Sequence, residues 1–175
     1  SHTDNYWELL PIEPLSLSKD LEFEEREKNS NFDRAEEKAV KAVQTHGMKI
    51  KGKEKNSKID EAYLLLGKAR YFSGRFIPAL EAFNYILFKY PGSSNINSAK
   101  IWRAKANLRL ENETIAKDNL NALLLKKDLS DDNKVEAYAT LAQLYINREE
   151  FDMAVLNLEN AANITKDKAF KGRLH

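Results

Sequence analysis

Residues 60–91 read DEAYLLLGKARYFSGRFIPALEAFNYILFKYP, and this stretch decides the fold. It places the small residue Gly67 twelve positions before Ala79, and the bulky Phe83 four positions after Ala79. The same arrangement recurs twice along the chain, first at Ala104, Ala116 and Leu120 and then at Ala142, Ala154 and Leu158. The central alanines are 37 and 38 residues apart. Small residues on two antiparallel helices let the helices approach closely, so the recurrence predicts an all-α array of stacked helix pairs.

The composition agrees with a helical protein whose outer faces are solvated. Of the 175 residues, 42% are hydrophobic and 31% charged, and only 6 are Gly and 4 Pro, which argues against a β-rich or loop-rich fold. The 28 Lys and Arg residues nearly balance the 27 Asp and Glu residues, so we expect no nucleic-acid partner. The absence of cysteine from the sequence excludes disulfides, thiolate zinc sites and Cys nucleophiles.

The expected organisation is an N-terminal segment followed by one repeat array. Residues 1–19 contain Pro11 and Pro14, which block a continuous helix, so we predict an extended segment laid against the first helices. The array covers 20–175: a divergent repeat at 20–45, repeats at about 60–93, 97–130 and 135–165, and the start of a further helix at 166–175. Its last helix stops without a cap, which suggests a fragment of a longer protein.

Residues 46–58 interrupt this pattern. They contain two glycines and five lysines with one glutamate, and they offer little apolar surface to bury. We expect a solvated basic loop, with a docking site for an acidic partner as the alternative.

No group of residues in the sequence points to catalysis. The three histidines, His2, His46 and His175, lie at the two termini and in the basic loop, and without cysteine they predict no metal site. Acidic pairs such as Asp131-Asp132 and Glu149-Glu150 stand at helix starts, where negative charge stabilises the helix dipole. No phosphate-binding loop, GxSxG or HExxH string occurs. We therefore expect neither an enzyme nor a cofactor.

The repeats resemble tetratricopeptide repeats (TPRs) in the identity and order of their main positions. The first full repeat supplies Tyr63, Leu66, Gly67, Ala79, Phe83 and Pro91. The middle one keeps Ala104, Ala116 and Leu120, and the third supplies Tyr138, Leu141, Ala142, Tyr145, Ala154, Leu158 and Ala161. The resemblance covers roughly residues 20–175 and implies a right-handed superhelical solenoid that binds other proteins. The spacing exceeds the usual repeat length of about 34 residues, and the extra residues fall in the connections between repeats.

A narrower resemblance rests on the opening string DNYWELLPIE at 4–13, followed by divergent TPR helices. This combination is similar to the SprE/PorW-type lipoproteins of the gliding-motility and type IX secretion machinery of Bacteroidota. The resemblance implies a periplasmic scaffold, anchored in the outer membrane through a lipidated cysteine upstream of this chain. Its partners would be envelope secretion or motility components, and this part of the protein would not itself contact the membrane.

The TPR register also predicts a binding groove on the concave face, lined by the first helix of each pair. The candidate partner-binding residues are Leu64, Lys68, Tyr71, Ile101, Lys105, Leu108 and Arg109. They predict an apolar floor carrying three cations, suited to an amphipathic helix or an extended peptide with acidic character. The N-terminal segment of the chain, or later repeats, could fill the groove instead. Leu64 stands where co-chaperone TPRs place the first lysine of their carboxylate clamp, which disfavours the binding of chaperone tails. Trp102 is expected to pack between helices.

Three functions are compatible with these features to different degrees. The first is a non-catalytic protein–protein interaction scaffold of the bacterial envelope. The second is a cytoplasmic TPR module that recognises peptides, similar to a co-chaperone adaptor. The third, an RNA-contacting repeat that uses the lysines of 49–58, is disfavoured by the nearly neutral total charge.

Overall fold

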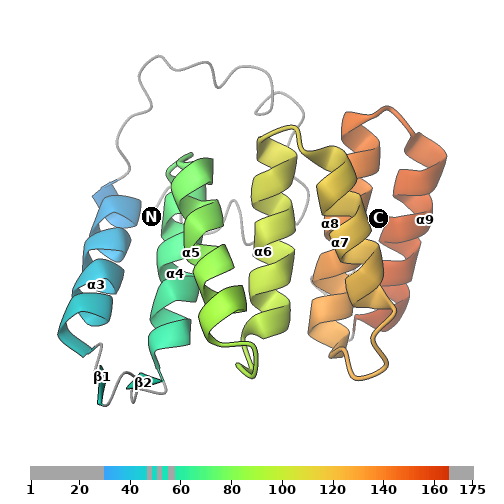
Figure 1. Cartoon of the computed structure of the whole chain (residues 1–175). Helices are drawn as coiled ribbons and strands as arrows, with labels where there is room; N and C mark the ends of the chain where they lie inside the picture. Colours follow the sequence, from blue (N-terminus) through green and yellow to red (C-terminus); the bar gives the residue numbers. More distant parts are fainter. Residues whose placement is uncertain (1–29, 47–48, 51–52, 55–57, 166–175) are drawn as a thin grey trace. The chain divides into compact units, whose positions relative to one another are not determined.

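The computed structural model is all-helical apart from one short strand pair, and it describes residues 30–46, 49–50, 53–54 and 58–165 (Figure 1). The helices are α3 (Ser30–His46), α4 (Ile59–Phe72), α5 (Phe76–Lys89), α6 (Ile96–Arg109), α7 (Glu113–Leu124), α8 (Asp131–Asn147) and α9 (Phe151–Ile164). They fall into two compact units, with the boundary between Glu111 and Asn112. The first unit holds α3 to α6 and the second holds α7 to α9. In each unit, consecutive helices pack on one another.

The repeats predicted at about 60–93, 97–130 and 135–165 coincide with the helix pairs α4–α5, α6–α7 and α8–α9. Ser130 caps α8 by accepting a hydrogen bond from the Asn133 amide at 3.3 Å. Within the divergent repeat predicted at 20–45, the described part is α3, which ends one residue later, at His46. The N-terminal segment 1–19, residues 20–29 of the divergent repeat and the further helix at 166–175 lie outside the described residues.

The loop prediction for 46–58 is wrong in one respect. Residues Lys49–Ile50 (β1) and Lys53–Glu54 (β2) form an antiparallel pair, with Lys49 opposite Glu54 and Ile50 opposite Lys53. A strand of two residues is too short to show the alternation of apolar and polar residues by which strands are recognised in a sequence.

Three turns of the chain share one backbone geometry. Gly74, Glu111 and Glu149 adopt positive φ angles of 72°, 61° and 59°, and no other described residue does so. They are 37 and 38 residues apart, the same spacings as those between Ala79, Ala116 and Ala154. In each turn, the residue after the positive-φ residue accepts a hydrogen bond through its carbonyl from the backbone amide of the alanine that follows, at 3.0 to 3.1 Å. The accepting carbonyls are those of Arg75, Asn112 and Glu150, and the donors are Ala79, Ala116 and Ala154. The backbone therefore repeats with the period predicted from the side chains.

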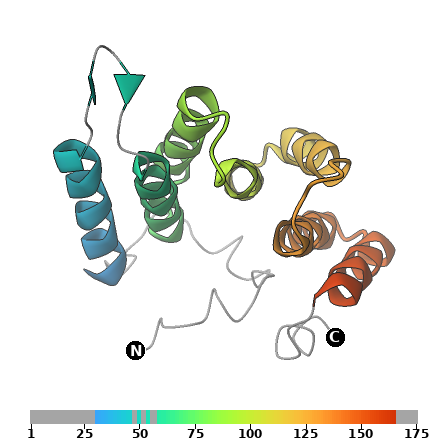
Figure 2. The same cartoon turned by 90° about the horizontal axis from the view of Figure 1, so that it is seen from below.

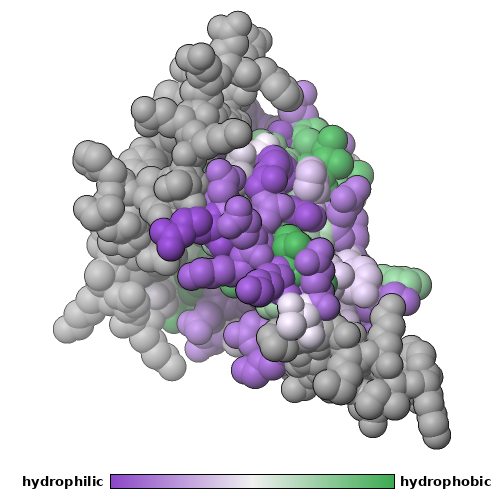
Figure 3. Space-filling view, turned by 90° about the vertical axis from the view of Figure 1, so that its left-hand side faces the viewer, coloured by the Kyte–Doolittle hydropathy of each residue, from purple (hydrophilic) through white to green (hydrophobic). Residues whose placement is uncertain are grey.

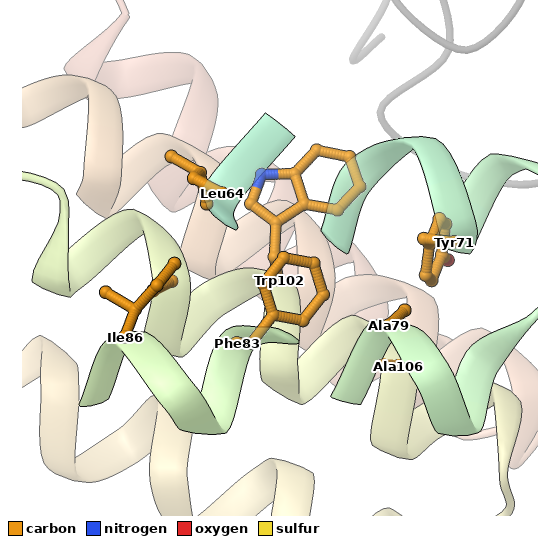
Figure 4. Close-up of a cluster of buried hydrophobic side chains, with 8 residues drawn as sticks. Leu64, Tyr71, Ala79, Phe83, Ile86, Trp102 and Ala106 are labelled. Atoms are coloured by element: carbon orange, nitrogen blue, oxygen red, sulfur yellow. The ribbon is translucent and has the colours of Figure 1, made fainter. Parts of the chain in front are cut away.

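The core of the first unit is built where α4, α5 and α6 meet. Trp102 of α6 lies among Leu64 and Tyr71 of α4 and Phe83 and Ile86 of α5 (Figure 4). The indole ring contacts Tyr71, Phe72 and Phe83 at centroid distances of 5.4, 5.5 and 6.4 Å. The prediction that Trp102 packs between helices is confirmed.

Most residues chosen as repeat positions are buried. Ala79, Phe83, Ala104, Ala116 and Ala142 have no exposed surface, and Leu120 and Ala154 are buried as well. Gly67 is buried with Phe83 as its nearest neighbour. Leu158 is half-buried against the α8–α9 core, and Pro91 is exposed in the turn after α5.

Polar contacts join α3 to the α4–α5 pair. Glu36 of α3 accepts a hydrogen bond from Arg70 Nε at 3.0 Å and forms an ion pair with Arg75. Arg70 also donates to the carbonyl of Pro78 at 3.1 Å. Figure 2 shows α3 beside α4, with the strand pair at one end of α3.

Candidate protein-binding face

Every charged residue of helix α6 is a Lys or an Arg. Its sequence, INSAKIWRAKANLR, contains Lys100, Arg103, Lys105 and Arg109 and no acidic residue. Burial lowers the pKa of the Arg103 guanidinium, but a guanidinium is so weakly acidic that the group stays charged. Four cations on a 14-residue helix create a local positive field, although the chain as a whole is nearly neutral.

Two lysines from different helices converge on Trp102. Lys68 of α4 places Nζ 4.9 Å from the centroid of the indole, and Lys105 of α6 places Nζ 4.2 Å from it. An ammonium group at this distance is attracted by the π electrons of the ring, an interaction of about 0.5–2 kcal/mol depending on exposure. The attraction holds both cations at the edge of the core rather than letting them extend into solvent.

A third cation continues the row along α6. The guanidinium of Arg109 lies 4.9 Å from the ring centroid of Phe76, and Phe76 in turn contacts Tyr71 at 5.4 Å. We refer to Lys68, Trp102, Lys105, Phe76 and Arg109 together as the cation–aromatic face. All five belong to the first unit, and their geometry is set by the packing of α4, α5 and α6.

The indole of Trp102 leaves one polar group unsatisfied. Trp102 is 8% exposed, and its Nε1 is buried with no hydrogen-bond partner in the part of the chain that the structure describes. Figure 4 shows this nitrogen on the side of the ring nearest Leu64. A buried donor without an acceptor costs about 1–3 kcal/mol, so an acceptor brought to this point would be favoured.

The apolar residues predicted to line the groove lie deeper than expected. Leu64 and Tyr71 belong to the core around Phe83, and Leu108 and the fully buried Ile101 are also part of the interior. Lys68, Lys105 and Arg109 are half-buried and carry charge at the surface. A ligand on this face would therefore meet the cations and the edge of the Trp102 cluster.

Two other described surfaces differ from this face in character. The outer side of α3 is mostly hydrophilic (Figure 3), and its exposed residues mix Arg34, Lys38 and Lys41 with Glu37. The second unit exposes apolar side chains on α9, namely Phe151, Met153, Val155 and Leu156. Within the described ranges, no group of three or more His, Cys, Asp or Glu residues could hold a metal ion, and no helix is long and apolar enough to cross a bilayer.

Sequence reasoning named the three cations but treated Trp102 only as a packing residue. The lack of acidic residues between Glu81 and Glu111 was visible in the sequence and could have pointed to α6 directly.

The helices, the repeated turns and the buried small residues define an all-α protein of helical-repeat type. Comparison with known proteins finds no family model that matches the chain and no curated protein that matches it.

Proposed function

We propose that this chain is a non-catalytic scaffold that binds other proteins through the cation–aromatic face. The observation that carries the proposal is the convergence of Lys68 and Lys105 on Trp102, beside the cationic helix α6. Trp, Tyr and Arg side chains are enriched at the centres of protein interfaces, and positive charge at such a surface attracts an acidic partner. The partner would present an acidic and partly apolar segment.

The finer assignment has two supports. TPR-type superhelical stacking is supported by the turn geometry that recurs at 37 and 38 residues. An envelope location, with a lipid anchor upstream and partners in the type IX secretion or gliding-motility apparatus, is supported by the resemblance of residues 4–13 to the SprE/PorW-type lipoproteins. The cytoplasmic peptide-recognition module is the competing assignment.

A capture experiment with matched variants tests the proposal. The full chain would be used to isolate partners from detergent-solubilised envelopes and, separately, from the cytosol of the source organism. A Lys68→Glu/Lys105→Glu/Arg109→Glu variant reverses the charge of the face. Lys89→Glu, which changes an exposed lysine on α5, serves as the control.

Secretion or motility proteins should be retained by the wild type and by the control and lost by the triple variant. Equal retention by the triple variant would place the interface elsewhere on the chain. Partners recovered only from the cytosol would overturn the envelope assignment and favour the peptide-recognition module.

A further inference from the structure

The second helix of the first repeat meets the next helix through two positions beside its central alanine. Counted from Ala79 of α5, these positions are Phe76, three residues before it, and Leu80, one residue after it. Both side chains are partly buried against the core that includes residues of α6. Phe76 also lies 4.9 Å from the guanidinium of Arg109 on α6. A following helix therefore covers this side of α5.

The middle repeat uses the same register inside the second unit. One residue after Ala116 of α7 stands Lys117. Its Nζ lies 5.2 Å from the ring centroid of Tyr145 in α8, the helix that follows. The position after the central alanine thus points to a following helix in both repeats.

In α9 the same positions are open. Counted from Ala154, they are Phe151 and Val155, whose exposed fractions are 58% and 53%. Leu158 continues the row at i+3 from Val155 and is half-buried against the α8–α9 core. We refer to Phe151, Val155 and Leu158 as the α9 face. It has the register of a surface that a helix covers, and α9 is the last helix in the described part of the chain.

The charges bordering the α9 face have one sign. Helix α9 contains Asp152 and Glu159 and no basic residue. Asp152 precedes Val155 by three positions and Glu159 follows it by four, so both are neighbours of Val155 on the helix surface. Both residues are exposed, and neither forms an ion pair within the described ranges. The helix that covers the corresponding side of α5 is α6, whose charged residues are all cationic.

We propose that the α9 face binds an amphipathic helix of a partner protein that carries Lys and Arg beside its apolar row. The apolar row covers Phe151 and Val155, and the cations pair with Asp152 and Glu159. A second copy of α9 would bring carboxylates against carboxylates, which opposes self-association through this surface. The α9 face lies in the second unit and attracts the charge opposite to that expected at the cation–aromatic face, so the inference is independent of the proposed function.

A pair of designed peptides tests the inference on the full chain. One peptide is an amphipathic helix of about 18 residues, with leucines on one side and lysines on the other, and it carries a fluorophore. The matched peptide has glutamate in place of each lysine. Fluorescence anisotropy should show that the lysine peptide binds the chain and that the glutamate peptide does not.

Variants of exposed residues on α9 locate the site. Phe151→Ser/Val155→Ser should weaken binding of the lysine peptide by about tenfold or more, because the apolar contact is lost. Met153→Ser is the matched control. Met153 is 40% exposed on the same helix, but it lies two residues from both Phe151 and Val155 and hence on the opposite side of α9. This control should leave the affinity unchanged.

Reversal of the border charges gives a positive signal. Asp152→Lys/Glu159→Lys should transfer the preference from the lysine peptide to the glutamate peptide. Such a transfer also shows that the charge-reversed chain is folded, since binding still requires the α9 face.

Three results would overturn the inference. The first is equal affinity of the lysine peptide for wild type and for Phe151→Ser/Val155→Ser. The second is a tenfold gain in affinity on Phe170→Ser, because the occupant would then be residues 166–175 of this chain. The third is a dimer of the wild type, seen in sedimentation, that Phe151→Ser/Val155→Ser dissociates, because the occupant would then be a second copy. None of these variants alters Lys68 or Lys105, so the proposed function is tested separately.

Discussion

The ring of Phe83 lies against the backbone of Gly67. A Cβ atom built at position 67 would come within 2.7 Å of Cδ1 and Cζ of that ring. Phe83 has no exposed surface and is enclosed by the core around Trp102, so the ring has little room to withdraw. This contact is where α4 and α5 come close enough to form a hairpin.

The first prediction concerns this contact. Gly67→Ala should lower the free energy of unfolding by about 1–3 kcal/mol, since overpacking outweighs the better helix propensity of alanine. Gly92→Ala is the control, because a Cβ there has no neighbour within 4 Å and its φ is not positive. Urea denaturation of both variants measures the difference. Equal stability of the two variants would mean that Phe83 can move aside.

The second prediction concerns the turn between α8 and α9. Glu149 has a φ of 59°, a conformation that strains any residue with a Cβ. Glu149→Gly should therefore stabilise the protein by about 0.5 kcal/mol, after allowing for the greater freedom of glycine in the unfolded chain. Glu159→Gly, in the interior of α9, should instead cost about 1 kcal/mol. Thermal unfolding distinguishes the two, and a loss of stability in Glu149→Gly would contradict the argument from strain.

The third prediction is a pH dependence from Asp60. Burial of this carboxylate raises its pKa, but hydrogen bonds from Ser93 and Asn95 and from the backbone amides of Glu61 and Asp60 outweigh that effect, so the pKa lies below 3.8. A carboxyl group whose pKa is lower in the folded than in the unfolded protein contributes its full stabilisation when the pH is above the unfolded-state pKa. This contribution is lost as the pH falls through the folded-state pKa.

Asp60→Asn should therefore cost about 1–2 kcal/mol at pH 7, because the charged acceptor is lost, and less as the pH falls below about 4. Denaturant unfolding of wild type and variant between pH 7 and pH 2.5 checks this. A difference between them that stays constant with pH would show that Asp60 does not link protonation to folding.

The fourth prediction concerns the ion pairs that attach α3. The side chain of Glu36 is only 14% exposed, and that of Arg70 is 23% exposed. Glu36→Gln should cost about 1–2 kcal/mol, because two guanidinium groups lose their charged acceptor. Glu61→Gln removes an ion pair whose side chains are 63% and 77% exposed, and it should change the stability by no more than about 0.5 kcal/mol. Similar effects of the two variants would mean that solvent screens the Glu36 network fully.

The helices from 59 onward were predictable because small and bulky residues recur in register with turn residues between them. Gly74 marked one turn by its residue type, but Glu111 and Glu149 reach the same conformation with a side chain that gives no hint of it. The strand pair at 49–54 was not predictable, since two residues per strand show no pattern.

The cation–aromatic face was predictable from the sequence only in its cations. The TPR register placed Lys68, Lys105 and Arg109 on one surface, but periodicity does not show how deeply a residue is covered. Ile101 and Leu108 were expected at an open floor and lie in the interior. The meeting of Lys68 and Lys105 at Trp102 depends on how α4 and α6 approach, which no local sequence pattern records.

The three matching turns have a consequence for the history of the chain. Their backbone is the same although the central residue changes from Gly to Glu, and their spacing varies by a single residue. Most side chains differ between the repeats, but the backbone conformation of the turn is retained. The left-handed residue at each turn is thus a backbone marker of the repeat, and it could locate further repeats whose side chains no longer match.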